Sequence, residues 1–193
     1  MVAFSHLLIG LGNPGDEYAR TRHNIGFRIV DALAEKRRCP PWKKKFKGLV
    51  TNTDALLLLK PQTFMNLSGE AALGAATFYK LKPENVIVFH DDLDLLPGQV
   101  KIKQGGGAGG HNGLKSLDAH IGKNYWRVRI GIGRPMTEQN IPVKGDAVTN
   151  YVLHPFSKAD STWLDPLIDN AAANIDLLLD GKTAAYARKL SSI

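Results

Sequence analysis

Apolar residues along this chain follow two different spacings, and each spacing predicts a type of element. Continuous or alternating apolar runs, which are typical of strands, recur through the first two thirds of the sequence. They predict strands at residues 7–9, 48–52, 54–60, 83–91, 98–104 and 126–133. Apolar residues spaced three and four apart, as on one face of a helix, lie between and after these runs. They predict helices at residues 25–39, 69–81, 114–121 and 157–180, and a short helix that ends at Arg188 and Lys189.

The order of these elements indicates the fold class. Strands alternate with helices, and some neighbouring strands are spaced as antiparallel pairs. Residues 1–193 are therefore predicted to form a single α/β domain, a mixed β-sheet flanked by helices. Residues 134–145 lack periodicity and are predicted to be a loop. Pro166 lies too deep for the first turn of the long helix, so this helix either begins after Ser157 or kinks, and Gly181 suits its C-terminal cap.

A glycine-rich turn follows the first predicted strand. Gly10, Gly12 and Gly15 match G-x-G-x-x-G, the spacing of a dinucleotide-binding turn. That motif requires a helix to begin at the third glycine, so that the helix N-terminus faces a pyrophosphate. Here Pro14 lies inside the turn, and helical periodicity begins only at Ile25. We therefore reject the dinucleotide-binding interpretation.

Composition limits the compartment and the type of partner. No apolar run approaches the roughly 20 residues that cross a bilayer, and the N-terminus lacks a signal-peptide pattern. The single cysteine, Cys39, precludes an internal disulfide. We therefore expect a cytoplasmic protein without a membrane partner. The net charge of +7, from 25 Lys and Arg against 18 Asp and Glu, favours anionic partners, nucleic acid above all.

Part of the positive charge is concentrated in residues 36–47, which contain no acidic side chain. We interpret this segment as a solvated connection between a helix and a strand. The alternative is a contact with an RNA backbone, in which Trp42 and Phe46 would be available to stack on bases.

Polar side chains that could perform chemistry follow several predicted strands. They are Asn13 and His23 after the first strand, Asn66 after residues 54–60, Asp91, Asp92 and Asp94 at the end of the strand 83–91, and His111 and Asn112 in the glycine-rich segment 105–113. Strand ends in α/β sheets commonly carry binding and catalytic groups, so we expect these residues to converge.

Several common types of site are disfavoured. Cys39 has no histidine nearby in sequence to activate its thiol, and Ser68 lies outside a G-x-S-x-G motif. No two histidines have metal-ligand spacing on one helix or strand. His90 and the aspartates that follow it could hold a divalent cation, but such clusters are more often solvated. We therefore do not expect a metal at this cluster.

A histidine that activates water accounts best for the remaining residues. A neutral imidazole accepts a proton from water near pH 7, and a carboxylate on its other nitrogen fixes its orientation. His23 and Asp91 would supply this pair. The amides of Asn13, Asn66 and Asn112 could position a carbonyl, a ribose hydroxyl or the water. Each residue alone is more often a turn former or an ordinary hydrogen-bonding group, so the hypothesis depends on their convergence.

Four motifs resemble those of the bacterial-type peptidyl-tRNA hydrolase family and occur in order over nearly the whole chain. They are Gly12-Asn-Pro-Gly15 with Thr21-Arg-His-Asn24, Lys60-Pro-Gln-Thr-Phe-Met-Asn-Leu-Ser-Gly69, His90-Asp-Asp-Leu-Asp94, and residues 105–113. The resemblance implies a three-layer sandwich that hydrolyses the ester between a peptide and tRNA and releases free tRNA. It also implies a monomer that needs no metal, no cofactor and no obligate protein partner.

By motif position, the resemblance assigns roles to individual residues. His23 would be the general base and Asp91 its orienting carboxylate. The substrate channel would be lined by Asn13, Tyr18, Met65, Asn66, His111 and Asn112. The 5′ phosphate end of tRNA would be held by Lys103 and Arg129.

The chain departs from the family pattern at two positions. Ala108 stands where many members have histidine, and Asp92 stands where glutamate is common. Neither residue replaces a proposed catalytic group, but at both positions the family pattern does not determine the detailed shape of the channel. Residues 134–150 correspond to a variable lid in the family. The alternative functions are an inactive RNA-binding or splicing-associated protein on the same scaffold, and a phosphate-dependent nucleotide enzyme.

Overall fold

A seven-stranded mixed sheet with the order β2-β3-β4-β1-β5-β7-β6 forms the centre of the computed structural model, which describes residues 3–53 and 55–191. The strands are β1 (His6–Gly10), β2 (Lys43–Lys45), β3 (Gly48–Asn52), β4 (Leu56–Pro61), β5 (Val86–Asp92), β6 (Val100–Gln104) and β7 (Trp126–Gly131). The neighbours β4, β1, β5 and β7 are parallel, whereas β2, β3 and β6 pair antiparallel. The predicted mixed sheet is confirmed.

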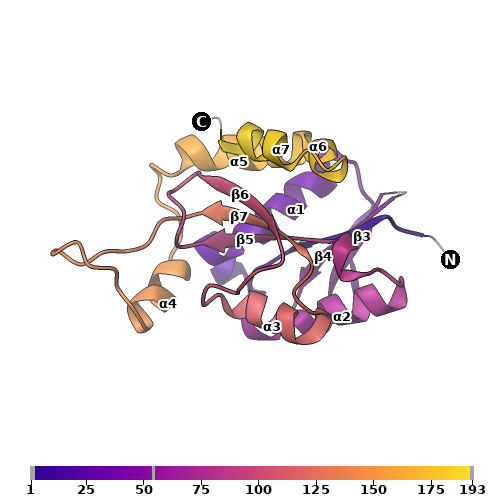
Figure 1. Ribbon diagram of the computed structural model, residues 1–193, viewed down its shortest axis with the longest axis horizontal. Helices are drawn as coiled ribbons and strands as arrows, with labels where there is room; N and C mark the ends of the chain where they lie inside the picture. Colours follow the sequence, from indigo (N-terminus) through magenta and orange to yellow (C-terminus); the bar gives the residue numbers. More distant parts are fainter. Residues whose placement is uncertain (1–2, 54, 192–193) are drawn as a thin grey trace.

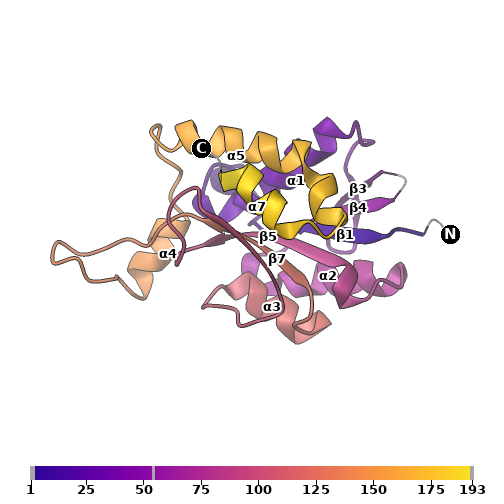
Figure 2. The ribbon, with the colours of Figure 1, turned by 45° about the horizontal axis from the view of Figure 1, so that its top comes forward.

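Helices cover both faces of this sheet and make three layers (Figures 1 and 2). One face carries α1 (Ile25–Lys36), α5 (Ser161–Ala173), α6 (Ile175–Leu179) and α7 (Thr183–Ser191). The other face carries α2 (Ser68–Phe78) and α3 (Asn112–Ile121). A further helix, α4 (Asp146–Val152), lies beyond one end of the sheet in both views. Among the described residues, no helix combines the length and apolar character that a membrane span requires.

The central strands are apolar on both sides because each side packs against helices. In β1, Leu8 belongs to the hydrophobic cluster beneath α1 and α5, whereas Leu7 and Ile9 belong to the cluster above α2 and α3. All three side chains are fully buried. This double burial explains why the sequence of β1 lacks the alternation of a half-exposed strand.

Two glycines bring α1 directly onto the sheet. A Cβ atom at Gly10 would lie 2.2 Å from the carbonyl oxygen of Gly26, and one at Gly26 would lie 2.3 Å from that of Phe89. Two short 3-10 helices, η1 (Asp16–Tyr18) and η2 (Arg22–Asn24), separate β1 from α1. Only a three-residue 3-10 helix follows Gly15, and the α-helix begins at Ile25, which agrees with the rejection of a dinucleotide-binding turn.

The basic segment 36–47 joins α1 to β3 with its strand lysines in solvent, as interpreted from the sequence, but it also contains a short strand that the sequence did not predict. Residues Lys43–Lys45 form β2, which pairs with β3 at the sheet edge through backbone hydrogen bonds. All three lysines are exposed, so no apolar alternation marked this strand. Trp42 and Phe46, the two aromatic rings proposed for stacking, are both half-buried, and each packs against a hydrophobic core cluster.

The C-terminal part of the chain also differs from the sequence prediction. The long helix begins at Ser161 rather than Ser157 and is divided at Asn174 into α5 and α6. Gly181, with φ +75°, follows α6 as a cap. Residues 134–145 contain no helix or named strand, as predicted, and α4 begins at Asp146, within the segment 134–150 that was matched to the lid of the family. Only seven residues long, α4 is too short for a periodicity that the sequence could reveal.

Candidate active site

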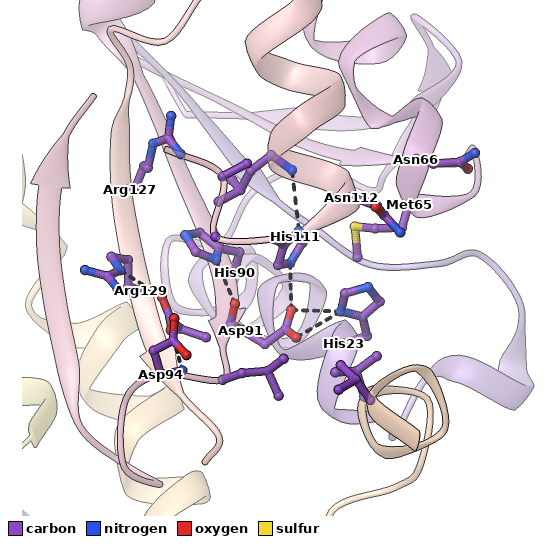
Figure 3. A pocket seen from close by; sticks show the side chains of 18 of the residues that line it. His23, Met65, Asn66, His90, Asp91, Asp94, His111, Asn112, Arg127 and Arg129 are labelled. Carbon is purple, nitrogen blue, oxygen red and sulfur yellow. Dashed lines mark hydrogen bonds and ion pairs between the residues drawn. The ribbon is translucent and has the colours of Figure 1, made fainter. Parts of the chain in front are cut away.

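A cavity of about 560 Å³ lies where the carboxyl ends of the parallel strands meet (Figure 3). The turns after β1, β4 and β5 all reach it, since parallel neighbours end at the same edge of the sheet. Every site residue named from the sequence is on its lining: Asn13, Tyr18, His23, Met65, Asn66, Asp91, Lys103, His111, Asn112 and Arg129. The expected convergence is therefore present in the fold.

His23 and Asp91 form a close pair inside this cavity. The Nδ1 atom of His23 lies 3.0 Å from Oδ1 and 2.9 Å from Oδ2 of Asp91 (Figure 3). A carboxylate only accepts hydrogen bonds, so Nδ1 carries the proton and Nε2 carries the lone pair. The side chain of His23 is 12% exposed, whereas that of Asp91 is 2% exposed. The arrangement leaves Nε2 as a proton acceptor backed by a buried charge.

The electrostatics of the pair follow from this geometry. Burial alone would lower the pKa of His23, but the charge and hydrogen bond of Asp91 outweigh it and raise that pKa above its ordinary value. Burial would raise the pKa of Asp91, but His23 and His111 hold it far below its usual range. Asp91 is therefore ionised, and an imidazolium at His23 would be stabilised where it forms.

His111 contacts Asp91 from the other side. Its Nε2 atom lies 2.9 Å from Oδ1 of Asp91, and its Nδ1 atom accepts hydrogen bonds from the backbone N–H groups of Gly113 and Leu114, at 3.1 and 3.4 Å. Nδ1 is thus an acceptor, so the proton is on Nε2 and is donated to Asp91. His111 caps the N-terminus of α3 with the same ring. Both of its nitrogens are engaged within the protein.

The same three residues have the spacing of a metal site. One donor atom each from His23, Asp91 and His111 lies within 4.8 Å of the others. A metal would need a lone pair on Nε2 of His111, and a neutral ring would then carry its proton on Nδ1. That proton would face the amide hydrogens of Gly113 and Leu114. The donor set therefore suits a hydrogen-bond network better than a cation.

His90, which precedes Asp91, contacts both Asp91 and His111. Its Nδ1–H group donates a 2.8 Å hydrogen bond to the backbone oxygen of Asp91, and its ring meets that of His111 edge-on at 5.1 Å. Burial, assisted by the proximity of His111, lowers the pKa of His90 to about 3. The ring is therefore neutral near pH 7, which does not favour the loose cation site considered from the sequence.

Asn13 is the most constrained of the three amides. Its Oδ1 atom accepts a 2.7 Å hydrogen bond from the backbone N–H of Met65, and the Asn24 side chain bonds both backbone polar groups of Asn13. Asn13 is 7% exposed, and within residues 3–53 and 55–191 its Nδ2 group has no protein partner. The Nδ2 group of Asn13 is therefore available to donate a hydrogen bond to a ligand.

The other predicted substrate residues lie at different depths. Met65 is buried, and Asn66 and Asn112 are exposed at the rim. In Figure 3 the amide of Asn66 points away from the His23–Asp91 pair. Tyr18, at the end of η1, is half-buried on the cavity wall.

The glycine-rich segment reaches the cavity from the far end of the sheet. β6 is antiparallel to β7, so residues 105–111 start at the opposite edge and run back beneath the sheet to α3 (Figure 1). Arg127 on β7 holds them there, since its guanidinium donates to the carbonyl oxygens of Gly107 and Gly106 at 2.8 and 2.9 Å, and to Asp118 at 2.9 Å. Arg127 is only 2% exposed. Sequence reasoning missed this role, because an arginine on an alternating strand usually faces solvent.

The basic residues proposed to bind phosphate differ in their availability. Lys103 is exposed on β6. Arg129 donates through Nε to Oδ2 of Asp92 at 2.8 Å, and the neighbouring Arg134 donates to Asp94 at 2.8 Å. Both arginines line the cavity, and each is engaged in an ion pair with an aspartate.

Comparison with known proteins identifies the family. A family model described as peptidyl-tRNA hydrolase matches residues 7–192. The chain belongs to the peptidyl-tRNA hydrolase family. It is 51% identical to the peptidyl-tRNA hydrolase of Rhodospirillum centenum over 189 residues, which cover 96% of this chain and 80% of that protein. The corresponding protein of Chelativorans sp. is 52% identical, with 96% and 76% covered. The crystal structure of peptidyl-tRNA hydrolase from Acinetobacter baumannii has a TM-score of 0.85 at 38% identity, and covers 97% of this chain and 96% of that chain.

The two departures from the peptidyl-tRNA hydrolase pattern now have structural positions. Asp92 is the carboxylate that pairs with Arg129, so the shorter side chain still reaches a basic partner. Ala108 is half-buried and packs against the cluster above α2 and α3. Its carbonyl oxygen accepts a hydrogen bond from the N–H of His111. Neither departure interrupts the contacts among His23, Asp91 and His111.

One wall of the cavity was not foreseen from the peptidyl-tRNA hydrolase motifs. The helix α4 contributes Val148, Thr149 and Val152, and Leu153 follows it. These residues are separated from every motif in sequence, and only the return of the chain over η2 brings them to His23.

Proposed function

We propose that this chain hydrolyses the ester bond of peptidyl-tRNA, with His23 as general base, and releases the peptide and free tRNA. Membership of the peptidyl-tRNA hydrolase family supports the substrate class. The observation that carries the mechanism is the hydrogen bond between Nδ1 of His23 and ionised Asp91, because it leaves Nε2 free to accept a proton. A general base of this kind accelerates a reaction by about 10²–10⁴-fold.

The reaction balances with a single water. Nε2 of His23 takes a proton from the water as its oxygen bonds to the ester carbonyl carbon, which gives a tetrahedral oxyanion. The Nδ2 group of Asn13 donates a hydrogen bond to this oxyanion in the proposal. A donor of this kind lowers the activation barrier by about 3 kcal/mol. The bond from carbon to the ribose oxygen then breaks, and the proton on Nε2 passes to that oxygen. The products are a carboxylic acid and a free ribose hydroxyl.

The remaining residues serve binding in this proposal. Tyr18, Met65, Asn66 and Asn112 contact the substrate around the ester, while His111 orients Asp91. Lys103 and Arg129 bind the 5′ phosphate end of the tRNA. The active species is a cytoplasmic monomer in which residues 1–193 act as one domain without a metal or cofactor.

One assay tests the reaction and the base together. N-acyl-aminoacyl-tRNA should be hydrolysed, and aminoacyl-tRNA with a free amino group should remain intact. His23→Ala should lower turnover by about 10²–10⁴-fold while tRNA affinity changes little, since the imidazole contributes chemistry rather than phosphate contacts. Full turnover by His23→Ala would contradict the assignment of the base. An inactive RNA-binding protein, the alternative from the sequence, would bind tRNA but release no peptide.

A further inference from the structure

Arg22, the residue before His23, joins the catalytic segment to α4. Its guanidinium nitrogen NH1 lies 3.3 Å from the carbonyl oxygens of Tyr151 and His154, and 3.1 Å from that of Pro155. Its side chain is 13% exposed. These acceptors include carbonyls at and beyond the C-terminal end of α4, where a helix carries partial negative charge and favours a cation.

Other contacts fix the same side chain. The guanidinium carbon lies 4.2 Å above the ring centroid of Tyr151 and 5.7 Å from that of Phe156. Asp160 lies 3.9 Å away as an ionic partner. The backbone N–H of Arg22 also donates to the oxygen of His154 at 3.2 Å. A planar guanidinium can satisfy carbonyls and stack on a ring at once, which an ammonium cannot do.

The position of α4 depends on few such contacts. Residues 134–145, which lead into α4, project away from the body of the protein in Figures 1 and 2. A seven-residue helix has little stability of its own and needs tertiary anchors. One anchor is the hydroxyl of Tyr151, which donates to the oxygen of Ile132 at 2.6 Å. The other is Arg22.

We propose that Arg22 is a positioning residue that holds α4 as one wall of the substrate cavity beside His23. This role rests on the proposed function for the identity of the substrate. Val148, Val152 and Leu153 present apolar surface to the cavity from this wall. The proposed proton transfer at Nε2 of His23 involves no residue of this wall. Arg22 therefore governs how tightly peptidyl-tRNA is bound and not the rate of the chemical step.

The test compares Arg22→Gln and Arg22→Lys with the wild type. Arg22→Gln should raise KM for N-acyl-aminoacyl-tRNA roughly tenfold, a typical size for coupling between linked elements, with kcat within about twofold. Arg22→Lys keeps the positive charge but loses the planar guanidinium, so its KM should lie between those of the wild type and Arg22→Gln. The acid limb of the pH profile of kcat should not move. Arg28→Gln is the control, since Arg28 pairs with Asp165 on α1 and α5, away from the cavity.

A second measurement separates anchoring from loss of folding. Amide hydrogen exchange in Arg22→Gln should accelerate in α4 and residues 153–155 while the core of α1 keeps its protection. Unchanged KM, a fall in kcat with constant KM, or a shifted acid limb would overturn the proposal. So would a general loss of protection that accounts for the lost activity.

Binding without turnover keeps this test independent of the proposed reaction. In the His23→Ala background, adding Arg22→Gln should raise the Kd for N-acyl-aminoacyl-tRNA by the same roughly tenfold. Failure of the wild type to hydrolyse the substrate would refute the proposed function. An unchanged Kd in the double variant would refute the role of Arg22.

Discussion

At the scale of single residues, the site depends on where two protons reside. Asp91 accepts from Nδ1 of His23 and from Nε2 of His111, and the N-terminal amides of α3 fix the second ring in that tautomer. The carboxylate is thus held ionised by two donors. His23 is left with one free nitrogen facing the cavity, and its basicity depends on Asp91.

Replacing Asp91 should move the pH profile in a defined direction. The base must be neutral, so kcat/KM of the wild type should fall as pH drops through the pKa of His23, which Asp91 raises above its ordinary value. Asp91→Asn removes the charge and leaves burial, which lowers that pKa, so the acid limb should shift to lower pH. Maximal activity should also fall by about 10⁴-fold, because an amide favours the wrong tautomer.

The control for this profile is Asp94→Asn, which removes a half-exposed carboxylate paired with Arg134. Its acid limb should coincide with that of the wild type. An unmoved limb in Asp91→Asn would mean that Asp91 does not set the basicity of His23.

His111 should show two separable effects, because one ring performs two tasks. His111→Ala removes the cap of α3 and should lower the free energy of unfolding by about 1 kcal/mol. It should also lower kcat, since Asp91 loses a donor. His111→Asn restores a good capping side chain, so urea unfolding should return towards the wild-type midpoint while kcat stays low. Recovery of both quantities would indicate that His111 acts only as a cap.

At the scale of elements, the turn that carries His23 is held by a close contact of helix and sheet. α1 begins directly after His23 and Asn24, and its second residue, Gly26, lies against the backbone of β5. There is no space for a side chain at this point. The position of His23 is therefore fixed by the packing of α1 as well as by its bond to Asp91.

Gly26→Ala should consequently be costly. The new Cβ would lie 2.3 Å from the oxygen of Phe89 and 2.4 Å from the nitrogen of Leu11, and both are backbone atoms. Overpacking of this kind costs about 3 kcal/mol, which urea unfolding would measure. Gly107→Ala is the matched control, because the described structure has no heavy atom within 4 Å of its added Cβ. Equal stability of the two variants would contradict the close contact.

At the scale of the whole molecule, the proposed binding of tRNA at the cavity depends on where the basic side chains lie. The net charge of +7 is carried partly by Lys103 on β6 and by Arg129 on β7, at one side of the site. Arg129 shares its charge with Asp92, whereas Lys103 is exposed. Lys103 should therefore contribute the clearer part of the phosphate contact.

The salt dependence of tRNA affinity tests this difference. Lys103→Ala should reduce the slope of log K against log salt by about one, because it removes one phosphate contact. Adding Arg129→Ala should weaken binding further. Lys182→Ala, which removes an exposed lysine paired with Asp180, should leave the slope unchanged. A double variant with the wild-type slope would exclude Lys103 and Arg129 from the RNA site.

The sequence by itself determined the layers, the family and part of the site. The apolar runs of β1, β4 and β5 predicted buried strands, and the polar residues at the strand ends, among them Asn13, His23 and Asp91, were expected to converge. The roles of Lys103 and Arg129 came from the family resemblance rather than from pattern.

Tertiary structure alone decided the rest, because it depends on contacts distant in sequence. The buried guanidinium of Arg127 returns the glycine-rich segment across the sheet and delivers His111 to Asp91. Backbone pairing with β3 makes a strand of Lys43–Lys45 despite their polarity. Arg22 and Tyr151 hold α4 over the cavity. Side-chain periodicity records which face of an element is buried, but not which carbonyl a distant arginine will bind.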